Sequence, residues 1–134
     1  MIVPDINKQF WDFVYSHVND NCLSLRLKYS NVCDFDVTFA IDQIEARQKV
    51  KDKLPFVALN KDFLFPSLLS AEQCTCEAVA DFKANYIFKG GYNSICDLTG
   101  GLGIDTLAFS SVIPSVTYVE RYAEYCLAAN HNFR

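Results

Sequence analysis

The sequence predicts an α/β fold in which a mainly helical N-terminal region leads into the opening βαβα of a parallel sheet. Apolar residues recur at three- and four-residue spacing through much of the chain before Gly90, which is typical of amphipathic helices. All five glycines lie between residues 90 and 103, and after them the pattern is strand, glycine turn, helix, strand, helix. We therefore expect a helical region over residues 1–67 and the start of a sheet domain over residues 68–134, with the sheet incomplete.

Composition limits the class of protein. The 134 residues are 51% hydrophobic and carry a net charge of −4, which suits one soluble domain, or two small pieces that share a core, and excludes a disordered chain. No apolar run reaches the roughly 18 residues of a membrane helix, and the first residues lack a secretory signal, so we expect a cytoplasmic protein without a membrane partner. The acidic balance argues against a general nucleic-acid coat protein.

The cysteine pattern predicts neither disulfides nor a metal site. Without a secretory signal, the six cysteines are expected to be reduced thiols, mostly buried. Cys74 and Cys76 are spaced C-x-C, and the two histidines lie far apart in the sequence, so no zinc spacing is present. We therefore expect no metal.

Periodicity and end signals predict the helical region. A helix is expected over residues 5–18 with Asp5 as its N-cap, and another over residues 35–51. The alternating leucines of residues 23–27 fit a short strand or a helix, and we favour a helix. Residues 56–66 are expected to form two short extended pieces around a turn, as in a small hairpin.

A third clear helix is expected before the glycines. Residues 70–73 read Ser-Ala-Glu-Gln, a capping box that would open a helix running to Phe88. Its expected buried face consists of Cys74, Ala78, Val79, Phe82 and Tyr86. The elements that follow are a strand over residues 94–98, a helix over 104–112, a strand over 116–119 and a helix over 121–133, with Cys96 expected to point inward.

Two acids and a glycine turn form the candidate binding site. Asp97 ends the first strand, and Glu120 ends the second strand, 17 residues after Gly103. A βαβ unit brings both strand ends to the edge of a parallel sheet where ligands bind. Glycines at 101 and 103 would let a ligand approach the backbone, and a carboxylate at 120 could accept both hydroxyls of a ribose. Asp97 would repel a pyrophosphate but favour a cationic ligand, and S-adenosylmethionine carries an ammonium and a sulfonium.

The segment from Asp97 to Gly103, together with Glu120, resembles the first two motifs of class I S-adenosylmethionine-dependent methyltransferases. Asp97 matches the first acid of that pattern, and Glu120 matches the acid that binds the ribose. Gly101 and Gly103 match the second and third glycines, whereas Thr99 replaces the first. The resemblance implies S-adenosylmethionine as cofactor, a Rossmann-like sheet, and these cofactor-binding residues: Asp97, Thr99, Gly100, Gly101, Gly103 and Glu120.

A narrower resemblance suggests the substrate. Residues 69–77 and 97–133 are similar to a group of bacterial proteins regarded as RNA methyltransferases, which have a helical N-terminal region and a THUMP-like region. The resemblance implies an RNA substrate, either tRNA or rRNA. Such enzymes have a sheet of about seven strands, and only the first two can be recognised here. We therefore expect the N-terminal part of a longer enzyme, inactive alone, with its catalytic residues beyond Arg134 and a free sheet edge that could pair with a second copy.

Several alternatives stay open. A nicotinamide- or flavin-binding enzyme is disfavoured because Thr106 stands where G-x-G-x-x-G needs its last glycine. A non-catalytic helical module that binds RNA or protein is another possibility. Asp105 could contact a ligand or simply suit the helix dipole, and Gln73 and Cys74 could lie beside the cofactor. A basic run could contact RNA phosphates or be a solvated helix end; it consists of Arg47, Lys49, Lys51 and Lys53.

Overall fold

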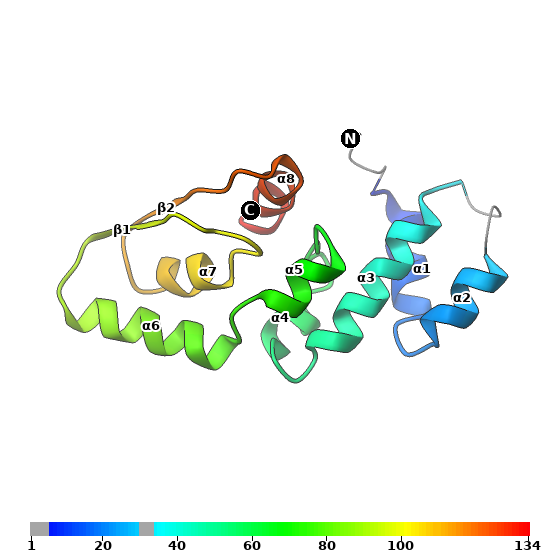
Figure 1. Ribbon diagram of the computed structural model, residues 1–134, viewed down its shortest axis with the longest axis horizontal. Helices are drawn as coiled ribbons and strands as arrows, with labels where there is room; N and C mark the ends of the chain where they lie inside the picture. The colour runs from blue at the N-terminus through cyan, green and yellow to red at the C-terminus, as the bar shows by residue number, and fades with distance from the viewer. Residues whose placement is uncertain (1–5, 30–33) are drawn as a thin grey trace.

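The computed structural model describes residues 6–29 and 34–134. It confirms the α/β prediction, because helices lead into a two-stranded parallel sheet. Figure 1 shows α1, α2 and α3 at one end of the molecule, the sheet with α6 and α7 at the other, and α4, α5 and α8 between them. The elements are α1 (Lys8–Ser16), α2 (Cys22–Lys28), α3 (Val37–Val50), α4 (Pro55–Leu59), α5 (Leu68–Gln73), α6 (Glu77–Lys89), β1 (Ser94–Asp97), α7 (Ile104–Ser110), β2 (Ser115–Tyr118) and α8 (Ala123–Asn132).

The first three helices begin at side-chain caps. The predicted cap of α1, Asp5, lies outside the described residues, and that prediction is wrong because Asn7 is the cap, accepting the Phe10 N–H at 3.0 Å. Asn21 caps α2, which confirms a helix rather than a strand there. Asp36 caps α3 by accepting the Phe39 N–H at 2.9 Å. In each case a short polar side chain satisfies a free amide of the first turn.

The hairpin expected over residues 56–66 is absent, and a helix followed by an irregular stretch takes its place. Pro55 occupies the first turn of α4, where its fixed φ suits a helix and its missing N–H is not needed. Side chains of α3 form hydrogen bonds with the backbone of the irregular stretch that follows α4. The Gln43 side chain donates to the Phe65 carbonyl at 2.8 Å and accepts the Phe65 N–H at 2.9 Å, so it replaces a strand partner.

Two helices form where the sequence predicts one. The N-cap is Ser67 rather than Ser70, and Ser70 is the third helical residue of a capping box with Ser67. The chain then leaves the helical conformation, since Cys74 has ψ 157° and Cys76 has ψ 153°. As a result α6 begins at Glu77 rather than continuing from α5.

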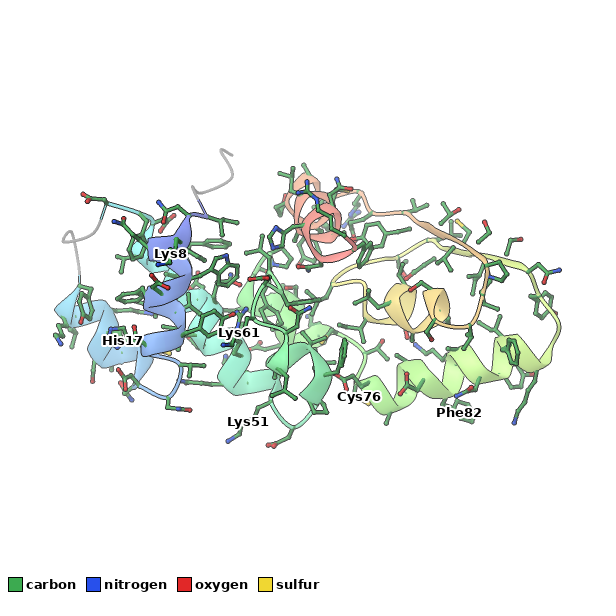
Figure 2. The ribbon with its side chains drawn as sticks, turned by 180° about the vertical axis from the view of Figure 1, so that it is seen from behind. Lys8, His17, Lys51, Lys61, Cys76 and Phe82 are labelled. Atoms are coloured by element: carbon green, nitrogen blue, oxygen red, sulfur yellow. The ribbon has the colours of Figure 1, made fainter. Side chains whose placement is uncertain are left out.

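The buried face of α6 is also different from the predicted one. Phe82 and Tyr86 are 71% and 74% exposed, whereas Ala80 and Ala84 are buried. Figure 2 shows Phe82 on the side of α6 that faces away from α7. The small alanines let α7 pack closely against α6, so the large apolar residues are left outside.

Two clusters of buried side chains form the core. The first joins α1, α2 and α3 and consists of Phe10, Val14, Leu25, Ala40, Ile41 and Ile44. The second consists of Ala46, Val50, Leu54, Val57, Phe63, Phe65, Ala71, Ala80, Leu102 and Ile104. Because the second cluster takes residues from both sides of position 67, the helical region and the start of the sheet share one core.

The last helix is fastened to the irregular stretch after α4. The Asn132 side chain accepts the Leu64 N–H at 2.7 Å and donates to the Leu64 carbonyl at 2.9 Å. The His131 ring donates to the Asp62 carbonyl at 2.7 Å. These bonds hold α8 beside residues almost 70 positions earlier in the chain.

The sheet consists of β1 and β2 in parallel, with Ser94 opposite Ser115 and Asp97 opposite Tyr118. Cys96 is exposed, contrary to expectation, because its neighbours Ile95 and Asp97 take the more buried positions. The other cysteines of residues 6–29 and 34–134 have free thiols that are only partly buried, so the prediction of mostly buried cysteines is wrong; Cys33 lies outside the described residues.

No group of three or more potential metal-ligating side chains is found within the described ranges. In that part of the chain, no helix has both the length and the apolar character needed to cross a membrane.

Candidate functional site

The turn between β1 and α7 requires glycine for two different reasons. Gly101 and Gly103 have φ of +53° and +84°, the left-handed region in which a side chain is strained. Close packing adds to this requirement at two positions. A Cβ on Gly103 would lie 2.4 Å from the Phe133 ring, and one on Gly100 would lie 2.1 Å from the Tyr118 ring. The glycines therefore set the shape of the turn, and aromatic rings cover part of it.

Asp97 fixes the beginning and the end of this turn. One carboxylate oxygen accepts the Thr99 N–H at 3.2 Å, and the other accepts the Thr106 hydroxyl proton at 2.7 Å. The residue that breaks the nicotinamide pattern, Thr106, thus ties α7 to the end of β1. The hydrogen bonds that the structure gives the Asp97 side chain are made to the turn and to α7.

Glu120 holds the middle of the turn from the end of β2. Its carboxylate accepts the Gly101 N–H at 3.0 Å, the Arg121 N–H at 2.7 Å and the Tyr122 N–H at 2.9 Å. Desolvation by itself would raise the pKa of Glu120, but these three bonds and the Arg121 charge outweigh it and lower that pKa. Glu120 is therefore a carboxylate at neutral pH.

Tyr118 completes the support of the turn. Its hydroxyl donates to the Gly101 carbonyl at 2.7 Å. Burial, and secondarily the charge of Glu120, raises the pKa of Tyr118, so the hydroxyl keeps its proton at neutral pH. Both backbone polar groups of Gly101 are consequently bonded to residues at the end of β2.

A groove of about 400 Å³ runs between this turn and the start of α6. Four predicted site residues, Thr99, Gly100, Gly101 and Gly103, line it. The two predicted acids, Asp97 and Glu120, are bonded to the backbone of the turn rather than among the groove-lining residues. The full lining consists of residues 99–105 and 73–75 with Ser70, Lys83 and Tyr125.

The groove contains a charged pair that sequence analysis missed. Lys83 of α6 and Asp105 of α7 form an ion pair of 2.9 Å, and the Thr75 hydroxyl donates to the same carboxylate at 2.8 Å. Asp105 could be noticed in the sequence because it follows the glycines, but nothing local marks Lys83 or Thr75. Only the packing of α6 against α7 brings them together.

The two residues before α6 that were considered as cofactor contacts do line the groove. They are Gln73, which ends α5, and Cys74, which follows it. Burial raises the pKa of the Cys74 thiol, and its Sγ donates to the Ala71 carbonyl at 3.2 Å. Cys74 is therefore a protonated thiol at neutral pH.

The basic run is mostly engaged within the protein. Arg47 is buried and donates to the carbonyls of Lys61 and Phe63 at 3.2 and 2.6 Å. Lys49 forms ion pairs with acidic side chains of α3 and α5. Lys53 donates to backbone carbonyls at the end of α5. These three side chains act within the fold, which favours the structural interpretation of the run over a phosphate-binding strip.

No protein-family model and no curated protein matches the sequence of this chain. Among solved structures, the chain matches a protein of Porphyromonas gingivalis W83 whose crystal structure is described as that of a "putative methyltransferase". The chain is similar in structure to this protein. The TM-score is 0.78 at 29% sequence identity, over 93% of this chain.

The methyltransferase likeness covers nearly the whole chain, so it includes the helical region as well as the turn and the sheet. The chain spans 31% of the length of the matched protein. The similarity supports the methyltransferase interpretation of the fold.

Proposed function

We propose that this chain forms the S-adenosylmethionine-binding part of a longer methyltransferase that acts on RNA. The observation that carries the proposal is the glycine turn held between Asp97 and Glu120 at the carboxyl ends of two parallel strands. This turn lines a groove, and it lies in a chain similar to a methyltransferase.

The charges of the site favour this cofactor over a dinucleotide. Carboxylates at 97, 105 and 120 surround the turn, and a pyrophosphate beside them would be repelled. A sulfonium compound with an ammonium group would be attracted by the same charges. Glu120 is half-buried, and each carboxylate oxygen can accept more than one hydrogen bond, so a ribose diol can bind while the turn stays bonded.

The described residues would bind and orient rather than react. S-adenosylmethionine supplies a methyl group on a positively charged sulfur that a nucleophile can attack. Such transfer depends largely on proximity and orientation. We propose that the groups that orient the acceptor lie in further sequence, since the chain spans 31% of the matched protein and its sheet has two strands among the described residues.

The test measures cofactor binding to the protein as its source cell makes it, by calorimetry with S-adenosylmethionine. Glu120→Ala should weaken binding at least tenfold, because it removes the ribose acceptor and loosens the turn. Glu124→Ala is the matched control, since Glu124 is exposed on α8 four residues further on. Absence of binding by the unaltered protein, or equal affinity in both variants, would refute the assignment.

The RNA substrate rests on the sequence resemblance of residues 69–77 and 97–133 and needs a separate test. Methyl-labelled S-adenosylmethionine should transfer label to total RNA stripped of its modifications, and ribonuclease should then release that label. Label that enters only protein or small molecules would reject the RNA substrate while leaving the cofactor proposal intact.

A further inference from the structure

We propose that Trp11 and Tyr15 of α1, together with Lys51 and Lys61, form a surface that binds unpaired nucleotides of the RNA substrate. The rings would stack with a base, and the lysines would bind the flanking phosphates. This inference rests on the proposed function, because it locates a contact surface for the RNA. Figure 1 shows α1 at the opposite end of the molecule from the sheet, so the bound nucleotides would flank the methylated base rather than include it.

Two aromatic rings lie next to each other on one side of α1. Trp11 and Tyr15 are four residues apart, which places them on the same side of the helix. Their ring centroids are 6.0 Å apart at an interplanar angle of 21°, and both residues are partly exposed. Unpaired bases stack on rings of this kind, and such stacking tolerates any base.

A lysine ammonium lies beside the rings. Lys61 is exposed, and its Nζ lies 5.7 Å from the centre of the Tyr15 ring. Figure 2 shows Lys61 beside α1. Lys61 forms no salt bridge with any residue that the structure describes. A phosphate bound to Lys61 would therefore place the base of the same nucleotide at the two rings.

Arg47 connects the rings to a hollow in the surface. Its guanidinium carbon lies 5.3 Å from the centre of the Trp11 ring and 5.9 Å from that of Tyr15. It also lines a hollow of about 370 Å³, together with Lys51, Gln48, Ala58 and residues 18–20. Lys51 is exposed at the end of α3 and has no salt-bridge partner within the described ranges. The hollow would take a neighbouring phosphate of the strand, with Lys51 as its partner.

The local charge suits phosphates although the whole chain carries a net charge of −4. The surface has three cations, Arg47, Lys51 and Lys61. The nearby carboxylates are Asp20, which lines the hollow, and Asp62, which adjoins Lys61 in the chain. Because an acidic protein repels RNA over much of its surface, a local excess of positive charge favours binding at this place. The excess is small, so stacking on the rings is needed as well.

The test measures RNA binding by the protein as its source cell makes it. The probe is a fluorescein-labelled single-stranded RNA of mixed sequence, about 12 nucleotides long, and fluorescence anisotropy is recorded over a range of salt concentrations. Lys61→Gln should weaken binding roughly fivefold or more. It should also make the slope of log K against log salt concentration less negative by about 0.7, the value for one phosphate contact with a single strand.

Lys89→Gln is the matched control. Lys89 is an exposed lysine at the end of α6, so its substitution changes the net charge equally at a distant place. It should change the affinity for RNA less than twofold and leave the salt slope unchanged. Neither substitution should change the melting temperature or the affinity for S-adenosylmethionine.

The rings need a second measurement, because truncating Trp11 would disturb the core cluster against which it packs. Trp11→Phe keeps an aromatic ring there and removes the indole emission. Since a stacked base quenches indole fluorescence, RNA should quench the tryptophan emission of the unaltered protein more strongly than that of Trp11→Phe.

The outcomes are distinguishable. If Lys61→Gln and Lys89→Gln bind the RNA equally well, or if quenching is the same with and without Trp11, the inference is overturned and the proposed function stands. Failure of the unaltered protein to bind RNA would refute the RNA part of the proposed function together with this inference. Calorimetry with S-adenosylmethionine then decides the cofactor part separately.

Discussion

Single side chains hold the irregular parts of this molecule in place. Gln43 is fully within the core and forms two hydrogen bonds with Phe65, in the manner of a neighbouring strand. Arg47, one helical turn further on, donates to the carbonyl of Phe63. The stretch between α4 and α5 thus satisfies its backbone through side chains of α3 rather than through secondary structure of its own.

Gln43→Leu should therefore be costly. The leucine fills a similar volume but leaves the N–H and carbonyl of Phe65 buried without partners, which costs about 1–3 kcal/mol for each group. Urea unfolding should show a loss of about 3 kcal/mol. Gln9→Leu, at an exposed position of α1, is the control and should change stability by less than about 0.5 kcal/mol. Equal effects of the two substitutions would contradict the role given to Gln43.

At the scale of elements, helix ends depend on individual caps. Ser67 begins α5 by accepting the Ser70 N–H at 3.1 Å, and its hydroxyl also lies 3.2 Å from the Tyr125 hydroxyl of α8. The cap therefore links the start of α5 to the last helix. Ser67 precedes the groove-lining residues Ser70 and 73–75 in the chain.

Ser67→Ala should destabilise the protein by about 1 kcal/mol, the usual effect of losing such a cap. Thermal unfolding is the measurement. Ser110→Ala serves as control, because the Ser110 hydroxyl is exposed and bonds only a carbonyl of its own helix. If Ser67→Ala unfolds at the same temperature as that control, the cap is not important for α5.

The elements that sequence predicts best are those decided by local signals. The glycine turn and the acids at the ends of β1 and β2 follow from the order of residues in the chain alone. The split between α5 and α6 does not follow from the order of residues. The Ser70–Gln73 pattern is a plausible cap on local grounds, and only the folded structure shows that Ser67 is the N-cap. For the same reason the Lys83–Asp105 pair could not be foreseen, since it depends on how α6 packs against α7.

The face of α6 shows how tertiary packing overrides periodicity. Its large apolar residues Val79, Phe82 and Tyr86 form a regular stripe, which predicts a buried face. The stripe is instead exposed, and the alanines at 80 and 84 are buried. Periodicity thus located the helix correctly and its buried side wrongly.

Over the whole molecule, an aromatic residue contributes to stability according to its burial in the shared core. Phe65 is fully buried where α3, α4 and α5 meet, whereas Phe82 is 71% exposed. Phe65→Ala should cost about 3–5 kcal/mol, and Phe82→Ala should change stability by less than about 0.5 kcal/mol. Chemical denaturation of this matched pair is the measurement. A large loss in Phe82→Ala would show that something covers α6 in solution.

The bonds between Asn132 and Leu64 have a consequence for biosynthesis. The two residues are 68 positions apart in the chain, and translation adds about 5–20 residues per second, so Leu64 is added to the chain roughly 3 to 14 seconds before Asn132. The first three helices can pack during this interval, because all residues of their cluster have already been translated. The Asp62 carbonyl and both backbone polar groups of Leu64 must wait, bonded to water, until α8 leaves the ribosome. A nascent chain stalled before residue 132 would therefore be protected from proteolysis in α1–α3 and susceptible at residues 62–64.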